Sequence, residues 1–171
     1  MGLGPGDIDY LVAEPRNHAK GYLAAFSLLN VLKRFLMERD AWAGYEGRWL
    51  RIRDVYPNGP AFGGAIGSAA AFAAILRDLL KERPILLSPG SRALLYERAR
   101  DGSGRAIAMT LGWHVGELDG RPYYFKEGGG AGFHCEMRVY PDRGLGSVVM
   151  TNRTSFASNA ILSRLDREVL R

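Results

Sequence analysis

The chain has 171 residues, a formal net charge of +5 and an apolar share of 47%, which suits one domain with a core of its own. No apolar run reaches the ~18–20 residues of a membrane span, and the start lacks a signal-peptide pattern, so we expect a soluble chain, cytoplasmic by default. The single cysteine, Cys135, excludes an intrachain disulfide and zinc sites built from paired cysteines.

The first predicted element is a helix over Lys20 to Met37, after an irregular segment at 1–18. Its apolar residues recur at helical spacing: Tyr22, Phe26, Leu29, Leu32 and Leu36. The region 42–64 is rich in glycine and proline and is predicted to be mostly loop, with one short strand from Trp49 to Val55.

The basic cluster RWLRIR at 48–53 raises the question of nucleic-acid binding. Trp49 could stack on a base and Arg51 could contact a phosphate. Only four of the 23 basic residues are lysines, the remaining arginines are scattered, and no known nucleic-acid-binding motif is present. A solvated strand face is the simpler interpretation, so we expect neither nucleic acid nor membrane as a partner.

Two capped helices follow. Ser68 is the expected N-cap of a helix that presents one apolar face: Phe72, Ile75, Leu76 and Leu79. Ser88, followed by Pro89 at the first helical position, predicts a shorter helix that ends near Arg98.

The apolar period then changes from 3.6 to 2, which predicts strands. Four alternating segments lie within 106–152, separated by turn signals at Asp119-Gly120, Gly128–Gly130 and 141–144. Short turns favour an antiparallel meander in chain order. A closing helix from about Ser155 is expected to bury four apolar residues: Ile161, Leu162, Leu165 and Val169.

The last predicted strand, Gly144 to Thr151, is continuously small or apolar at its centre. Such a strand is typical of the middle of a sheet, covered on both faces and paired on both edges. A meander in chain order places it at an edge instead, where unpaired backbone groups invite another strand. We therefore expect self-association or a partner chain at this strand.

The ordered set of segments resembles the C-terminal half of the penicillin-recognising serine hydrolases: class C β-lactamases, D-Ala-D-Ala carboxypeptidases, and related esterases and D-aminopeptidases. The residues that carry the resemblance are GPAFGGAIGSAAAFAAILRDLL, LLSP, LGWHVGELDG and KEGGGAGFHCEMRVYPDRGLGSVVMTN. The resemblance implies an α/β (α+β) fold in which helices flank an antiparallel sheet, and hydrolysis of a small ester or amide without a cofactor or metal.

The resemblance places the third motif of that family at Lys126-Glu127-Gly128. Lys126 would then offer a positive charge to a substrate carboxylate or to the transition state, and Gly128 would leave room for substrate. The N–H of Gly129 would be an oxyanion donor, and Gly130 would adjoin the substrate. A strand lysine followed by a glycine-rich hairpin remains the alternative interpretation.

Glu127 replaces the usual threonine of that motif. Its carboxylate would repel a substrate carboxylate unless strand alternation turns it away. This favours an esterase or amidase over an enzyme acting on β-lactams.

The nucleophile motif of the family, Ser-x-x-Lys, is absent, because none of the serines has a lysine three residues on. Tyr56-Pro57-Asn58 matches the second motif, Tyr-x-Asn, but reads as a turn. We therefore expect a single partial domain over 1–171, which lacks the N-terminal half of the family domain and is inactive alone. The alternative is a non-catalytic interaction module that pairs through its exposed strand edge.

Overall fold

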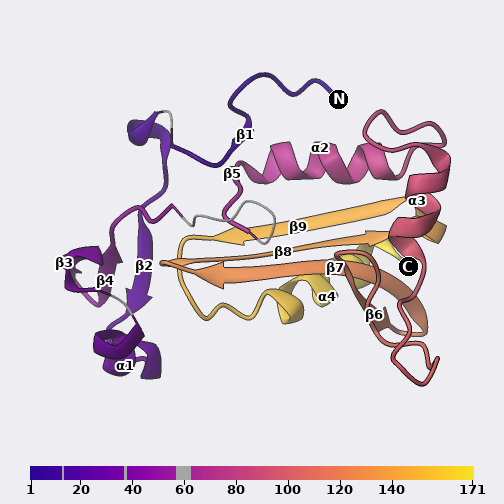
Figure 1. The fold of residues 1–171 in the computed structure, drawn as a ribbon. Helices are drawn as coiled ribbons and strands as arrows, with labels where there is room; N and C mark the ends of the chain where they lie inside the picture. Colours follow the sequence, from indigo (N-terminus) through magenta and orange to yellow (C-terminus); the bar gives the residue numbers. More distant parts are fainter. Residues whose placement is uncertain (13, 37, 57–62) are drawn as a thin grey trace.

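The computed structural model describes residues 1–12, 14–36, 38–56 and 63–171 (Figure 1). The described residues form four α-helices and three antiparallel sheets. The helices are α1 (Leu28–Leu36), α2 (Ala69–Leu79), α3 (Pro89–Tyr96) and α4 (Ser158–Val169). The strands are β1 (Ile8–Asp9), β2 (Gly21–Ala24), β3 (Trp42–Glu46), β4 (Trp49–Ile52), β5 (Ile66–Gly67), β6 (His114–Leu118), β7 (Arg121–Gly130), β8 (Phe133–Tyr140) and β9 (Leu145–Thr151). The expected mixed α/β class is confirmed.

The main sheet is the predicted meander, in the order β6-β7-β8-β9. Helix α2 covers one face and α4 the other (Figure 1). On the α2 face, Leu76 and Leu79 pack with Val139 and Trp113 in the largest apolar cluster. The predicted caps of α2 and α3 are confirmed, since Ser68 accepts from the N–H of Ala71 and Ser88 from that of Ser91.

The turn predicted at Gly128–Gly130 lies two residues further along. Those glycines belong to β7, and Gly130 pairs with Phe133 across a two-residue loop of Ala131 and Gly132. Both loop residues have positive φ, 49° and 87°, which is the conformation that a tight hairpin with the right-handed strand twist requires. The glycine run therefore forms a strand without side chains, and the turn follows it.

The helix predicted from Lys20 begins only at Leu28. The preceding residues form β2, because Tyr22 and its neighbours pair with β4 and alternate between buried and half-buried positions. The strand ends at Ala24, and Ser27 directly precedes α1, where its hydroxyl accepts from the N–H of Asn30 in the first turn of the helix. In the region 42–64 the strand predicted from Trp49 is present as β4, although it ends at Ile52. The stretch before it, predicted as loop, forms β3 and pairs with β4 in a hairpin, and residues 57–62 lie outside the described residues.

The closing helix buries different residues from those predicted. Leu162 is buried, but Ile161, Leu165 and Val169 are 38%, 55% and 69% exposed. The reason is the sheet face beneath α4, which carries the fully buried Arg138. Its guanidinium contacts Glu136 at 2.7 Å and Asp166 of α4 at 3.2 Å, so the side of α4 that faces the sheet must be polar.

Two surfaces remain uncovered among the described residues. Strand β9 pairs with β8 on one edge only, and no described strand lies on its other edge, as the sequence indicated. Helix α1 exposes an apolar stripe: Leu28, Val31, Leu32 and Phe35. None of the described helices is long and apolar enough to cross a membrane.

Candidate active-site wall

The second half of β7 has a strand partner on one side only. Strand β6 pairs with β7 as far as Phe125, whereas β8 continues to Gly130. Residues 126–130 therefore present one backbone edge that no described strand occupies. Because β7 also carries the Lys126-Glu127-Gly128 motif, this open edge is the natural place to look for a site.

The register decides which backbone groups face the open edge. In a two-residue hairpin the flanking residues bond to each other, and the pairing then alternates along the strand. Arg121 flanks the β6–β7 turn, so the backbone groups of odd-numbered residues turn towards β6. Beyond Phe125 that side is open, and the N–H and C=O of Glu127 and Gly129 face outward.

A hollow of about 540 Å³ lies beside this edge, and we call it the β7 hollow. Its walls come from β6, β7, β8 and the segment that leads into α4. The lining residues are His114, Phe125, Glu127, Gly128, Gly129, His134, Thr154 and Ser155.

His134 organises the polar side of the β7 hollow. Its Nε2 lies 2.9 Å from Oε1 of Glu127 and 3.0 Å from Oγ of Ser158. A Ser-His-acid triad needs the serine on one ring nitrogen and the acid on the other. Here both partners share Nε2, and Ser158 is only 1% exposed, so this cluster positions the Glu127 carboxylate and does not activate a nucleophile.

The structure brings together some of the residues predicted from the motif. Glu127, Gly128 and Gly129 line the β7 hollow, whereas Lys126 and Gly130 do not. Lys126 is exposed on the α2 face of the sheet, since it pairs with Met137, which packs against the α2 cluster. Alternation thus turns Glu127 towards the hollow face and Lys126 away from it.

Other nucleophile and metal chemistries gain no support. Burial raises the pKa of the Cys135 thiol, which disfavours the reactive thiolate. Within the described ranges, no group of three His, Cys, Asp or Glu side chains is arranged to hold a metal ion. Of the literal Tyr-x-Asn match, Pro57 and Asn58 lie outside the described residues.

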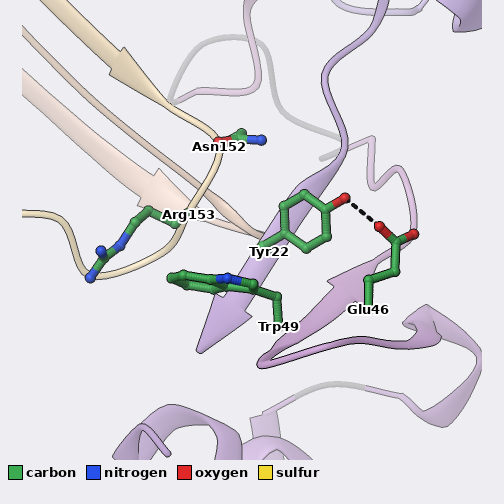
Figure 2. A pocket seen from close by; sticks show the side chains of 5 residues that line it. All are labelled: Tyr22, Glu46, Trp49, Asn152 and Arg153. Atoms are coloured by element: carbon green, nitrogen blue, oxygen red, sulfur yellow. Dashed lines mark hydrogen bonds between the residues drawn. The ribbon is translucent and has the colours of Figure 1, made fainter. Parts of the chain in front are cut away.

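A second hollow, of about 360 Å³, lies next to the first, and we call it the Trp49 hollow (Figure 2). It is lined by Tyr22, Glu46, Trp49, Asn152 and Arg153. The backbone of Tyr22 holds it together, because its N–H donates to Asn152 O and its C=O accepts from Thr154 N, both at 3.0 Å. Sequence reasoning missed this hollow, because its residues come from separate segments that share no motif.

The Glu46 carboxylate is tied down at the rim of the Trp49 hollow. The Tyr22 hydroxyl donates to Oε2 at 2.7 Å (Figure 2). The Lys20 ammonium lies 3.0 Å from Oε1. The hydrogen bond from Tyr22 and then that from Lys20 hold the pKa of Glu46 below its usual value. Glu46 therefore stays ionised and already has a cationic partner.

Comparison with protein families gives one match. The family model described as Beta-lactamase matches residues 32–171, which is most of the chain. No curated protein and no solved structure matches the chain.

Proposed function

Because the chain belongs to the beta-lactamase family, we propose that it forms one wall of a serine-hydrolase site that transfers an acyl group from an ester or amide to water. The observation that carries the proposal is the open edge of β7, where the Gly129 N–H faces the β7 hollow without a strand partner.

In this proposal Gly129 supplies an oxyanion donor. An acyl-transfer transition state carries its negative charge on the former carbonyl oxygen, and a fixed N–H there contributes about 3–4 kcal/mol. The donor is fixed because residues on both sides of it are paired with β8. Gly128, which lacks a side chain, keeps the adjoining space clear for the substrate.

Lys126 has an electrostatic role in the proposal. It is the first residue of the open edge and is exposed on the α2 face, so its flexible side chain would bring its charge to the site from that side of the sheet. Gly130, at the end of β7, lets the hairpin tip lie close to the substrate.

The charge of the β7 hollow favours a particular substrate. Glu127 contributes a carboxylate, and no lysine or arginine is among the lining residues. A substrate carboxylate placed there would be repelled by Glu127. We therefore propose an ester or amide whose group beside β7 is uncharged, in preference to a β-lactam with a carboxylate at this position.

The nucleophile of this site comes from outside these 171 residues, because the sequence contains no Ser-x-x-Lys. The chain alone is then inactive, and a fluorophosphonate probe leaves it unlabelled. Covalent labelling of a serine within the chain would contradict this part of the proposal.

A second test looks for the missing segment. The DNA upstream of Met1 and the neighbouring genes are searched for a sequence that encodes Ser-x-x-Lys, and any such segment is co-expressed with this chain. Ester hydrolysis by the combined polypeptides that falls when Lys126 is replaced by alanine supports the wall assignment, and unchanged hydrolysis refutes the role of Lys126.

A second candidate function is an interaction module without catalysis. It is favoured by the unpaired edge of β9 and by the exposed apolar stripe of α1. In that case no complementary Ser-x-x-Lys segment exists, and gel filtration gives a stable dimer.

A further inference from the structure

The Trp49 hollow has a surplus of positive charge. Lys20 and Arg51 lie 3.0 and 4.0 Å from the single carboxylate, Glu46. Arg153 lines the same hollow and has no ion-pair partner among the described residues. Glu46 is thus already paired with two cations, and Arg153 is the lining cation without an ion-pair partner among the described residues, so the hollow favours a negatively charged ligand over an ammonium group.

Arg153 is held in a way that leaves its donors available. The central carbon of its guanidinium lies 5.4 Å from the centroid of the Trp49 ring and 6.0 Å from that of the Phe156 ring. A guanidinium beside an aromatic ring keeps its planar fork of N–H donors, which can bind a carboxylate with two hydrogen bonds. Among the described residues, a long contact of 3.4 Å to the Ser155 carbonyl is the only hydrogen bond that uses one of them.

Two of the lining side chains, Tyr22 and Trp49, are aromatic. Figure 2 shows the rings of Tyr22 and Trp49 on one side of the hollow, with Asn152 and Arg153 on the other. Aromatic faces bury an apolar body, while the guanidinium binds the acid. A site with both features should bind an organic carboxylate more tightly than an inorganic anion, which has no apolar body to bury.

The two hollows share one segment of chain. Asn152 and Arg153 line the Trp49 hollow, and the next two residues, Thr154 and Ser155, line the β7 hollow. The Thr154 hydroxyl also accepts from the N–H of Gly132 at 3.0 Å, which fixes this segment against the hairpin tip of β7 and β8. A ligand held at Arg153 could therefore extend along this segment towards the open edge of β7.

From these observations we propose that the Trp49 hollow is a binding subsite for a carboxylate carried on an aromatic or other apolar body. That this ligand is the substrate rests on the proposed function. That the hollow binds such a carboxylate does not depend on it. The negative charge that Glu127 excludes from the β7 hollow is then accepted at Arg153.

The test is equilibrium binding to the intact chain, followed by the amide NMR signals of Trp49 and Arg153. The probe is 3-phenylpropionate, compared with 3-phenylpropanol and 3-phenylpropylamine, which have the same body, and with inorganic phosphate. We expect 3-phenylpropionate to bind at least about tenfold more tightly than the other three, which corresponds to about 1.4 kcal/mol.

Arg153→Gln should weaken 3-phenylpropionate binding by about tenfold, and Arg153→Lys should restore only part of it because the fork is lost. The matched control is Arg143→Gln, which removes an exposed arginine in the β8–β9 turn and should leave binding unchanged. Equal binding of the amine or of phosphate, or an unchanged affinity in Arg153→Gln, overturns the subsite. If the probe binds as expected but no combined polypeptide hydrolyses esters, the proposed function fails while the subsite stands.

Discussion

His134 reaches across from β8 to hold Glu127 of β7, with Nε2 2.9 Å from the carboxylate oxygen Oε1. The other ring nitrogen, Nδ1, lies where a side chain at Gly129 would be, only 2.7 Å from an ideal Cβ. The absence of a side chain at Gly129 is therefore what allows the histidine to lie flat along the sheet and face the hollow.

Gly129→Ala should displace the His134 ring and break its contacts with Glu127 and Ser158. Forcing a methyl group into this space should cost about 1–3 kcal/mol of unfolding free energy. Gly128→Ala is the matched control, because its Cβ would meet Cys135 Sγ at 3.8 Å, an ordinary contact. Urea unfolding and the imidazole NMR signals of His134 measure both effects. A Gly129→Ala protein with wild-type stability and an unmoved His134 would show that the close approach is not real.

The contact between α2 and β9 gives a second pair of variants. A Cβ at Gly146 would lie 2.9 Å from Cβ of Leu76, so Gly146→Ala should push α2 from the sheet and cost about 1–3 kcal/mol. The next residue, Ser147, faces the other side, and its buried hydroxyl has no hydrogen-bond partner among the described residues. Ser147→Ala should be neutral or stabilising by up to about 1 kcal/mol. Thermal unfolding of both variants checks the contrast, and equal losses would contradict it.

The buried charges under α4 predict a large effect. Asp166 accepts from Arg138 at 3.2 Å and from the Tyr140 hydroxyl at 2.8 Å. Asp166→Ala leaves both donors buried without that acceptor and should cost about 3–5 kcal/mol. Arg167→Gln is the control, since the ion pair of Arg167 with Asp119 is on the surface and its loss should shift the urea midpoint little. A small effect of Asp166→Ala would mean that water reaches Arg138.

Asp78 predicts a dependence of stability on acid pH. Hydrogen bonds from the backbone N–H of Leu86, together with those from Lys81 and Ile85, lower the pKa of this carboxyl in the folded chain. A lowered folded pKa adds stability that is complete above the unfolded pKa of about 3.9 and is lost as pH falls through the folded value. Asp78→Asn should therefore be less stable than the wild type at pH 6, with the difference shrinking below about pH 4. Urea midpoints measured from pH 6 to pH 2 provide the check, and a constant difference would contradict it.

The β9 edge can be tested without disturbing the sheet. By the same alternation as in β7, odd-numbered residues of β9 bond to β8 and even-numbered ones face the open edge. Met150→Pro should therefore leave the chain folded but abolish pairing with any added strand, whereas Val149→Pro should disrupt the β8–β9 ladder. Gel filtration and circular dichroism distinguish the two. A dimer that survives Met150→Pro would place the interface elsewhere.

Local signals determined much of the fold. The alternation from His114 to Thr151, with its turn residues, predicts the meander and its exposed final edge, and the serine caps predict α2 and α3. These features depend on neighbours in sequence, so the sequence reveals them. The family motif likewise pointed to Glu127, Gly128 and Gly129, which line one hollow. Whether any of these three residues, or Lys126 and Gly130, acts in chemistry stays a prediction.

Only the tertiary structure decided the remainder, because it depends on contacts between distant segments. Nothing local indicates that Tyr22 pairs with β4, where its strand conformation overrides a helical pattern. The polarity of the α4 interface follows from Arg138 on another element. The Trp49 hollow exists because β2 bonds to the segment at 152–154, more than a hundred residues away along the chain. Sequence periodicity shows which face of an element is apolar, but the partner across that face is fixed by three-dimensional packing.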